Sequence, residues 1–153
     1  ALLSWSKSGR PLVLIDEAGK MFGVLSEVGR TVSKPRGSGY SVKIWLENDG
    51  DSASQIEAFT RNGIVSEKRQ ATAQLTDGWS IFLYSGDDPE IAQSNCNEKT
   101  ILILSKLTHK SKICEIIDVT YLRQSGAVSV DMDSGAPEFE GSKNAARNRP
   151  WGY

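Results

Sequence analysis

Residues 100–107 read Thr100-Ile101-Leu102-Ile103-Leu104-Ser105-Lys106-Leu107 and contain one of the two longest aliphatic runs of the chain. A short aliphatic run bounded by polar residues is typical of a buried strand. Residues 78–84 before it and 114–118 after it predict two more strands. Pro89 lies between the first two strands and can open a short helix that reaches Cys96. These segments predict the core of a sheet.

The C-terminal side of this core predicts a strand–helix–strand unit. Residues 119–125 read as a helical turn capped by Gly126, and residues 127–130 read as the last strand. Two strands joined through a helix favour a parallel pair with a crossover connection.

The N-terminal half has shorter strands with regular turn signals. Residues 12–15 and 21–25 predict strands, and turns about ten residues apart favour an antiparallel meander. Residues 40–46 fit a strand or a short helix. Residues 52–59 predict a short helix capped by Asp51 or Ser52. Residues 60–76 predict a loop with one edge strand.

Length and charge limit the classes of protein that fit. The chain has 153 residues, with 18 Lys and Arg against 19 Asp and Glu. The length is that of one domain, and nucleic-acid contact would need a local basic patch because the chain has no basic excess. No apolar run approaches the roughly 20 residues of a membrane span, and no signal peptide is visible. Because the chain opens at Ala1 without Met, we expect it to be cut from a longer protein. We predict a linker over 1–10, one domain over 11–133 and a flexible tail over 134–153.

One loop has the composition of a nucleic-acid contact. The segment Lys34-Pro35-Arg36-Gly37-Ser38-Gly39-Tyr40 is basic, glycine-rich and next to an aromatic residue. Lys34 and Arg36 could hold the phosphate backbone while Tyr40 stacks on a base. The alternative is an ordinary solvated hairpin loop.

Metal and nucleophile chemistry have weaker candidates. His109 is the only histidine, and zinc sites usually combine several Cys and His ligands. A carboxylate set could instead hold Mg²⁺, although Asp in turns is also ordinary local hydrogen bonding; its members are Asp16, Asp49, Asp51, Asp87, Asp88 and Asp118. No phosphate-binding loop, dinucleotide fingerprint or nucleophile elbow appears.

The two cysteines leave two readings open. In an oxidising compartment Cys96 and Cys114 could close a loop of 19 residues, which contributes about 3 kcal/mol in the chain-entropy account. In a reducing compartment they would be buried thiols.

Several segments together resemble one family, the ComEC-type competence proteins in the form found in alphaproteobacteria. The N-terminal resemblance, to the region after the last membrane helix, is carried by residues 11–19, 33–40 and 45–51. The C-terminal resemblance is carried by residues 114–118, 122–123, 126–128 and 149–151. The most specific parts are the Trp-Leu-x-x-Asp-Gly-Asp segment at 45–51 and the Cys-x-x-x-Asp…Leu-Arg-x-x-Gly-Ala order that begins at Cys114. The resemblance runs from about Trp5 to Trp151.

The resemblance implies a fold and a function. ComEC-type proteins are inner-membrane channels that pass single-stranded DNA into the cell, and their C-terminal domain is related to metallo-β-lactamases. It implies an α/β (α+β) domain of degenerate metallo-β-lactamase-like fold, with a mixed sheet. The implied partners are the membrane-spanning part of the same polypeptide, single-stranded DNA and other competence proteins. The implied location is the inner membrane, with this domain on the periplasmic face.

The family's metal signature, His-x-His-x-Asp-His, is absent from this sequence. Ser85-Gly86-Asp87 resembles the family's Gly-Asp ligand turn, and Thr108-His109-Lys110-Ser111 stands where the family has His-His-Gly-Ser. Asp87 and His109 are thus residual metal candidates, but two ligands cannot hold a dinuclear site. We expect a non-catalytic domain without a cofactor that helps to assemble the channel or touches incoming DNA. The alternatives are a residual metal-dependent nuclease that degrades the non-transforming strand, and a purely structural module.

Overall fold

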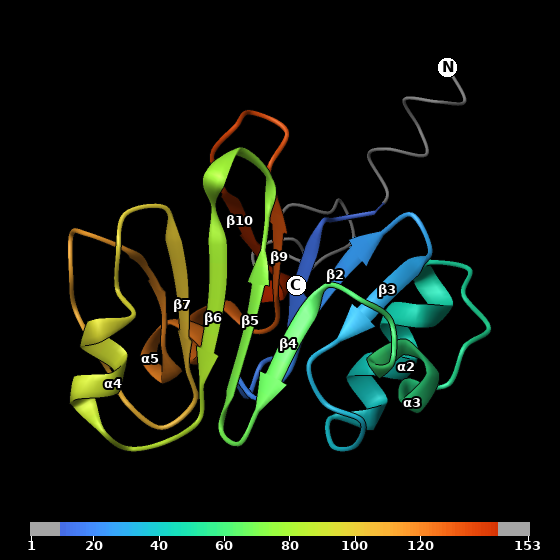
Figure 1. The fold of residues 1–153 in the computed structure, drawn as a ribbon, viewed down its shortest axis with the longest axis horizontal. Coiled ribbons are helices and arrows are strands. Elements are labelled where there is room, and N and C mark those ends of the chain that lie inside the picture. Colours follow the sequence, from blue (N-terminus) through green and yellow to red (C-terminus); the bar gives the residue numbers. More distant parts are fainter. Residues whose placement is uncertain (1–9, 144–153) are drawn as a thin grey trace.

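The computed structural model describes residues 10–143, in which two five-stranded sheets pack face to face (Figure 1). The first sheet has the order β10-β9-β1-β2-β3, and all of its neighbouring strands are antiparallel. Its strands are β1 (Val13–Ile15), β2 (Phe22–Ser26), β3 (Gly29–Val32), β9 (Val128–Asp131) and β10 (Glu138–Gly141). The chain therefore begins and ends its described part in the same sheet.

The second sheet is mixed and has the order β4-β5-β6-β7-β8. Its strands are β4 (Ile64–Glu67), β5 (Gln70–Gln74), β6 (Ser80–Tyr84), β7 (Thr100–Leu104) and β8 (Glu115–Ile117). A short 3-10 helix, η1 (Thr76–Gly78), lies between β5 and β6. β6 and β7 are parallel, with Ser80 beside Thr100 and Tyr84 beside Leu104, and β8 continues the parallel set. β7, the centre of the predicted core, is buried along its whole length.

The main core lies between the two sheets. Alternate residues of β1, β2 and β9 in the first sheet, and of β5, β6 and β7 in the second, point to this layer, as the period of two in a strand requires. The first sheet contributes Val13, Ile15, Phe22, Val24, Val128 and Val130, and the second contributes Ala71, Ala73, Ile81, Leu83, Ile101, Ile103 and Ile117.

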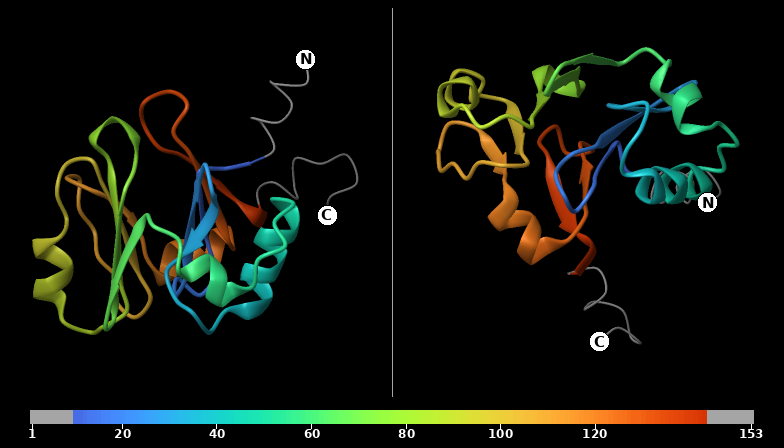
Figure 2. Two further views of the ribbon diagram at one scale, coloured as in Figure 1. Left: turned by 45° about the vertical axis from the view of Figure 1, so that its right-hand side comes forward. Right: turned by 90° about the horizontal axis from the view of Figure 1, so that it is seen from below.

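Helices cover the outer face of each sheet, so the layers run helix, sheet, sheet, helix (Figure 2, left). On the first sheet, α2 (Gly39–Asn48) and α3 (Gln55–Phe59) pack Val42, Trp45, Leu46 and Ala58 against Met21 and Val32. On the second sheet, α4 (Pro89–Ser94) packs Ala92 against Phe82, Tyr84, Leu102 and Leu104. Among residues 10–143, no helix combines the length and apolar character needed to cross a bilayer.

The predicted strand–helix–strand unit exists, but its two strands are not a pair. α5 (Val119–Ser125) begins after Asp118, whose side chain caps it, and ends at Gly126 with φ 72°. The helix leaves β8 in the second sheet and delivers the chain to β9 in the first, where β9 pairs antiparallel with β1. The parallel pair predicted here was therefore wrong. The parallel crossover lies one step earlier, in β6–α4–β7.

The structure decides or corrects three other local predictions. Residues 40–46 belong to a helix, because the face with Val42, Trp45 and Leu46 covers the first sheet. The segment 60–76 holds two strands, β4 and β5, instead of one. The cap of α3 is Ser54, which forms a reciprocal capping box with Glu57.

The prediction of a flexible tail over 134–153 was wrong for its first part. Residues Glu138–Gly141 form β10, which pairs with β9 across the register Phe139 to Val130. Phe139 is the one large apolar residue of this strand and packs on the core, so the alternating pattern was too short to indicate a strand. Residues 144–153, and the predicted linker apart from Arg10, lie outside the described residues.

Candidate nucleic-acid interface

The segment Lys34–Tyr40, here called the basic loop, connects β3 to α2 and is held at both ends. The Ser38 hydroxyl donates to a carboxylate oxygen of Asp16 at 2.7 Å. The Gln55 side-chain amide donates to the backbone oxygens of Lys34 at 3.2 Å and Gly37 at 2.9 Å. These bonds fix the loop against the β1–β2 turn on one side and α3 on the other.

Asp16 is the residue that joins the two turns. Its side chain is buried, with 3% exposure. One carboxylate oxygen accepts the backbone N–H groups of Lys20 at 2.8 Å and Met21 at 3.1 Å, and the other accepts the Ser38 hydroxyl. A buried carboxylate is stable only when such donors surround it. Asp16 is a candidate metal ligand by residue type, whereas in the structure its oxygens position the basic loop.

The three candidate side chains of the basic loop differ in exposure. Tyr40 is 80% exposed, although it is aromatic and lies in the first turn of α2. Arg36 is exposed, whereas Lys34 is half-buried. The structure therefore presents Tyr40 and Arg36 to solvent from a fixed backbone, and Lys34 less fully.

The start of α2 adds to the positive character of the loop. Ser38 has a left-handed φ of 47°, and its hydroxyl is directed to Asp16 instead of capping the first N–H groups of the helix. The N-terminus of a helix carries a partial positive charge from these groups. This charge has the same sign as the Lys34 and Arg36 side chains, so the loop favours an anionic neighbour.

The Trp-Leu-x-x-Asp-Gly-Asp segment is structural. Arg30 is fully buried and holds Asp49 with two hydrogen bonds of 2.7 and 3.0 Å. Arg61 holds Asp51 in the same two-pronged manner, with one bond at 3.1 Å. The hydrogen bond from Arg61 lowers the pKa of Asp51, and Asp51 in turn raises the pKa of Arg61. Both carboxylates are thus engaged by arginines.

The remaining acidic candidates have local roles or none. The side chains of Asp88 and Asp118 cap α4 and α5. Asp87 is exposed in the turn after β6. Across residues 10–143, no group of three or more His, Cys, Asp or Glu side chains is placed to hold a metal ion.

Asp87 and His109 follow the ends of two neighbouring parallel strands, β6 and β7, which brings their segments to one edge of the sheet. Figure 1 shows the connections that follow β3 and β6 at the same lower edge of the sandwich. His109 lines a groove between residues 108–111 and α5, and Asp87 is not among the residues that line it. The structure therefore brings the two segments to one edge but does not place both side chains in one groove.

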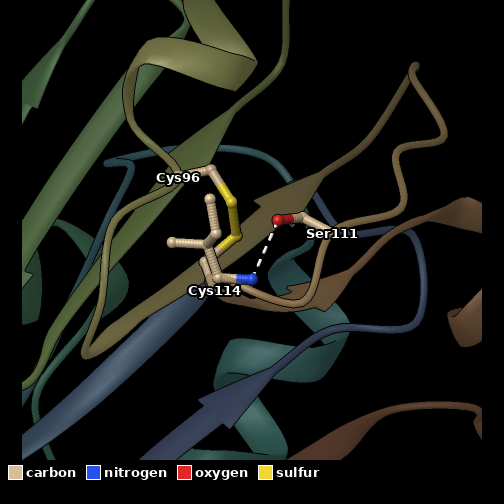
Figure 3. Close-up of a disulfide and its surroundings, with 4 residues drawn as sticks. Cys96, Ser111 and Cys114 are labelled. Atoms are coloured by element: carbon tan, nitrogen blue, oxygen red, sulfur yellow. Dashed lines mark hydrogen bonds between the residues drawn. A yellow bond between two sulfur atoms is a disulfide. The ribbon is translucent and has the colours of Figure 1, made fainter.

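Cys96 and Cys114 form a disulfide, with a Cα–Cα distance of 5.2 Å (Figure 3). The bond joins the segment after α4 to the start of β8 and encloses β7 and residues 105–113. Both cysteines are buried and belong to the apolar cluster beneath α4. Near the bond, the Ser111 hydroxyl accepts the backbone N–H of Ile113 at 3.0 Å (Figure 3).

The β1–β2 turn connects the basic loop to the end of β7. Asp16 in this turn binds Ser38, as described above. At Gly19 a Cβ atom would lie 2.9 Å from Leu122 Cδ1 and 3.6 Å from Ser105 Cα, so the turn lies directly on α5 and on the residue after β7. Sequence reasoning missed that Gln55 holds the basic loop and that Gly19 lies against α5. Gly19 has φ 69°, a conformation that glycine adopts without strain.

No family model, curated protein or solved structure matches this chain.

Proposed function

We propose that this chain is a non-catalytic domain of a ComEC-type DNA-uptake channel, which touches incoming single-stranded DNA through the basic loop. The observation that carries the proposal is Tyr40, an aromatic side chain 80% exposed on the same loop as the exposed Arg36, and this loop is held by Asp16 and Gln55. An exposed ring within a basic segment is what sequence-tolerant binding of single strands requires. A fixed loop also loses little conformational freedom on binding.

The family resemblance of the sequence supports the channel context. The helix–sheet–sheet–helix order of layers supports a degenerate metallo-β-lactamase-like fold, which remains part of the proposal. The membrane-spanning part of the same polypeptide and other competence proteins are the proposed partners.

The Cys96–Cys114 disulfide supports a location on the periplasmic face of the inner membrane. Structural disulfides form and persist in oxidising compartments, including the bacterial periplasm, and are rare in the cytosol. On that face the domain would meet DNA before the strand passes through the membrane.

Binding of a fluorescent 20-nucleotide single strand at 50 and 200 mM salt tests the DNA contact. Two phosphate contacts, from Lys34 and Arg36, predict a loss of about sevenfold in affinity over this range, from a slope of about −0.7 per contact. Tyr40→Ala should weaken binding by about tenfold, as the loss of one stacked base does, whereas Tyr40→Phe should bind as the wild type.

Arg36→Ala removes one positive charge from the basic loop, and Lys99→Ala is its matched control. Lys99 is exposed and directly precedes β7. It therefore lies at the opposite end of the sheet from the edge that carries the basic loop. Its loss removes one positive charge without touching the basic loop. Absence of binding at 50 mM salt would overturn the DNA contact and leave only a structural role in the channel.

The rival function is a residual metal-dependent nuclease. It is favoured by one observation, the parallel register of β6 and β7 that brings the segments of Asp87 and His109 to one edge. Metal analysis of the purified protein and plasmid nicking with Mn²⁺, Mg²⁺ or Zn²⁺ test it. Cleavage that disappears in Asp87→Ala would overturn the non-catalytic proposal.

A further inference from the structure

A second basic segment lies in the connection between β7 and β8. Residues 105–113, here called the lysine loop, contain Lys106, Lys110 and Lys112, and all three side chains are exposed. No Asp or Glu occurs between Glu98 and Glu115. In a chain whose net charge is −1, this run is a local concentration of positive charge.

The lysine loop forms one wall of a groove with a volume of about 800 Å³. The wall consists of residues 108–111, and α5 provides the facing wall with Thr120, Tyr121 and Gln124. Tyr121 is 38% exposed. The groove thus combines an accessible aromatic ring with hydroxyl, amide and lysine side chains.

Asp118 fixes the two walls to each other and is not free to repel an anion by direct contact. It is 9% exposed, and its two carboxylate oxygens accept the backbone N–H groups of His109 at 3.3 Å and Tyr121 at 2.9 Å. Glu115 is the exposed carboxylate among the lining residues and Lys110 is the lysine among them, while Lys106 and Lys112 lie in the same loop outside the lining. The disulfide at Cys114 anchors the far end of the lysine loop.

The groove is joined to the basic loop by the β1–β2 turn. Ser38 of the basic loop binds Asp16 at one end of this turn. At the other end Gly19 lies against Leu122 of α5 and against Ser105, the first residue of the lysine loop. Lys20 is exposed between them. The basic loop and the lysine loop thus both contact this one turn, and Lys20 places a further positive charge on it.

We infer that the groove between the lysine loop and α5 is a second contact for the same single-stranded DNA, with Tyr121 stacking on a base, Lys110 neutralising a phosphate in the groove, and Lys106 and Lys112 adding positive charge from the rest of the loop. This inference rests on the proposed function and extends the path of the strand along the edge of the sandwich. Flexible single strands suit a bent path of this kind, because they are bound by a series of stacking positions along a basic groove.

The test measures the affinity of the full chain for a 20-nucleotide single strand, with Tyr121→Ala and the pair Lys110→Ala/Lys112→Ala. Tyr121→Ala should weaken binding about tenfold, and Tyr121→Phe should not. The double lysine variant should make the salt slope shallower by about 1.4, that is by about 0.7 for each lysine charge removed. Lys99→Ala is again the control, and circular dichroism of each variant checks that it is folded.

The outcomes separate this inference from the proposed function. If Arg36→Ala and Tyr40→Ala weaken binding while the Tyr121 and lysine variants do not, the second contact is wrong and the proposed function stands. If the wild type binds no DNA, both are wrong. If the groove variants lose binding of a poly-glutamate peptide but keep full affinity for DNA, the groove serves an acidic protein partner and the inference is overturned.

Discussion

The Arg30 guanidinium and the Asp49 carboxylate form a two-pronged ion pair between β3 and the end of α2, with side chains only 0% and 4% exposed. Arg30 also donates to the backbone oxygens of Pro11 and Leu12. Gly23 on the neighbouring strand leaves room for it, since a Cβ there would lie 2.9 Å from Arg30 Cδ. One buried side chain thus ties the entry of the chain, the first sheet and α2 together.

Asp49→Ala should destabilise the domain by about 3–5 kcal/mol, because it leaves the Arg30 charge buried without a partner. Urea unfolding followed by circular dichroism measures this loss. The double variant Arg30→Met/Asp49→Leu should recover most of the loss, since well-packed apolar residues often replace a buried pair at little cost. A double variant as unstable as the single one would show that the hydrogen bonds to Pro11 and Leu12 dominate.

The Asp51–Arg61 pair predicts a loss of stability in acid. The hydrogen bond from Arg61 holds the pKa of folded Asp51 below its ordinary value of 3.8. A depressed carboxyl pKa contributes stability above the unfolded value, and this contribution is lost as the pH falls through the folded value. Asp51→Asn should therefore cost about 1 kcal/mol at pH 7. The difference from wild type should shrink below pH 3.8; a difference that stays constant down to pH 2 would contradict this explanation.

Asp131 predicts the opposite dependence of stability on pH. Burial raises its pKa, and so do the charges of Asp133, Glu138 and Glu140. A raised carboxyl pKa means that the ionised group disfavours the folded state, so stability from this group increases as the pH falls. Asp131→Asn should stabilise the protein by about 0.5 kcal/mol at pH 7, because Glu138 lies directly opposite on β10. Thermal unfolding measures the gain. Asp133→Asn, at an exposed position, is the control and should change stability less.

The disulfide should contribute about 3 kcal/mol, since it closes a loop between cysteines 18 positions apart. The variant Cys96→Ser/Cys114→Ser should unfold at a lower urea concentration than the oxidised wild type. Reductant should lower the midpoint of the wild type and leave the double variant unchanged. Trypsin gives a second readout, because Lys106, Lys110 and Lys112 lie in the enclosed loop; faster cleavage there after reduction is expected. Equal wild-type midpoints with and without reductant would contradict the prediction.

Ser38→Ala should weaken binding of single-stranded DNA although Ser38 need not touch the DNA. The variant removes the hydrogen bond that holds the basic loop to Asp16 and leaves one buried carboxylate oxygen without its donor, at a cost of about 1 kcal/mol. A several-fold loss of affinity with an unchanged salt slope would show a positioning role, because the number of phosphate contacts stays the same. A shallower slope would instead show that the loop no longer brings Arg36 to the backbone.

The sequence predicted what depends on local pattern. The aliphatic run of β7, the proline at the start of α4, and the start of α5 at Val119 with its end at Gly126 all appear as expected. It could not predict which sheet β9 joins, because Val128 and Val130 present the same alternation to either partner. It also could not predict β10, where Phe139 alone marks the buried face.

In the candidate site, too, local features could be predicted from the sequence and long-range contacts could not. Composition identified Lys34, Arg36 and Tyr40 as a surface loop, and the structure adds the reason why this loop has one conformation. That reason lies in Asp16 and Gln55, which are 22 and 21 positions away from the residues whose groups they bind. Hydrogen bonds across such separations leave no periodic trace in a sequence. The lysines of residues 105–113 can be read directly from the sequence. Their position relative to Tyr121 cannot, because it depends on how α5 packs.

The Cys96–Cys114 bond has a mechanical consequence. If a partner or a moving DNA strand pulls on the two ends of this domain, tension along the backbone passes from residue 96 to residue 114 through the sulfur atoms. The force then bypasses the fully buried strand β7 and the whole lysine loop. The domain could stretch or shed its outer strands under load while this segment keeps its length.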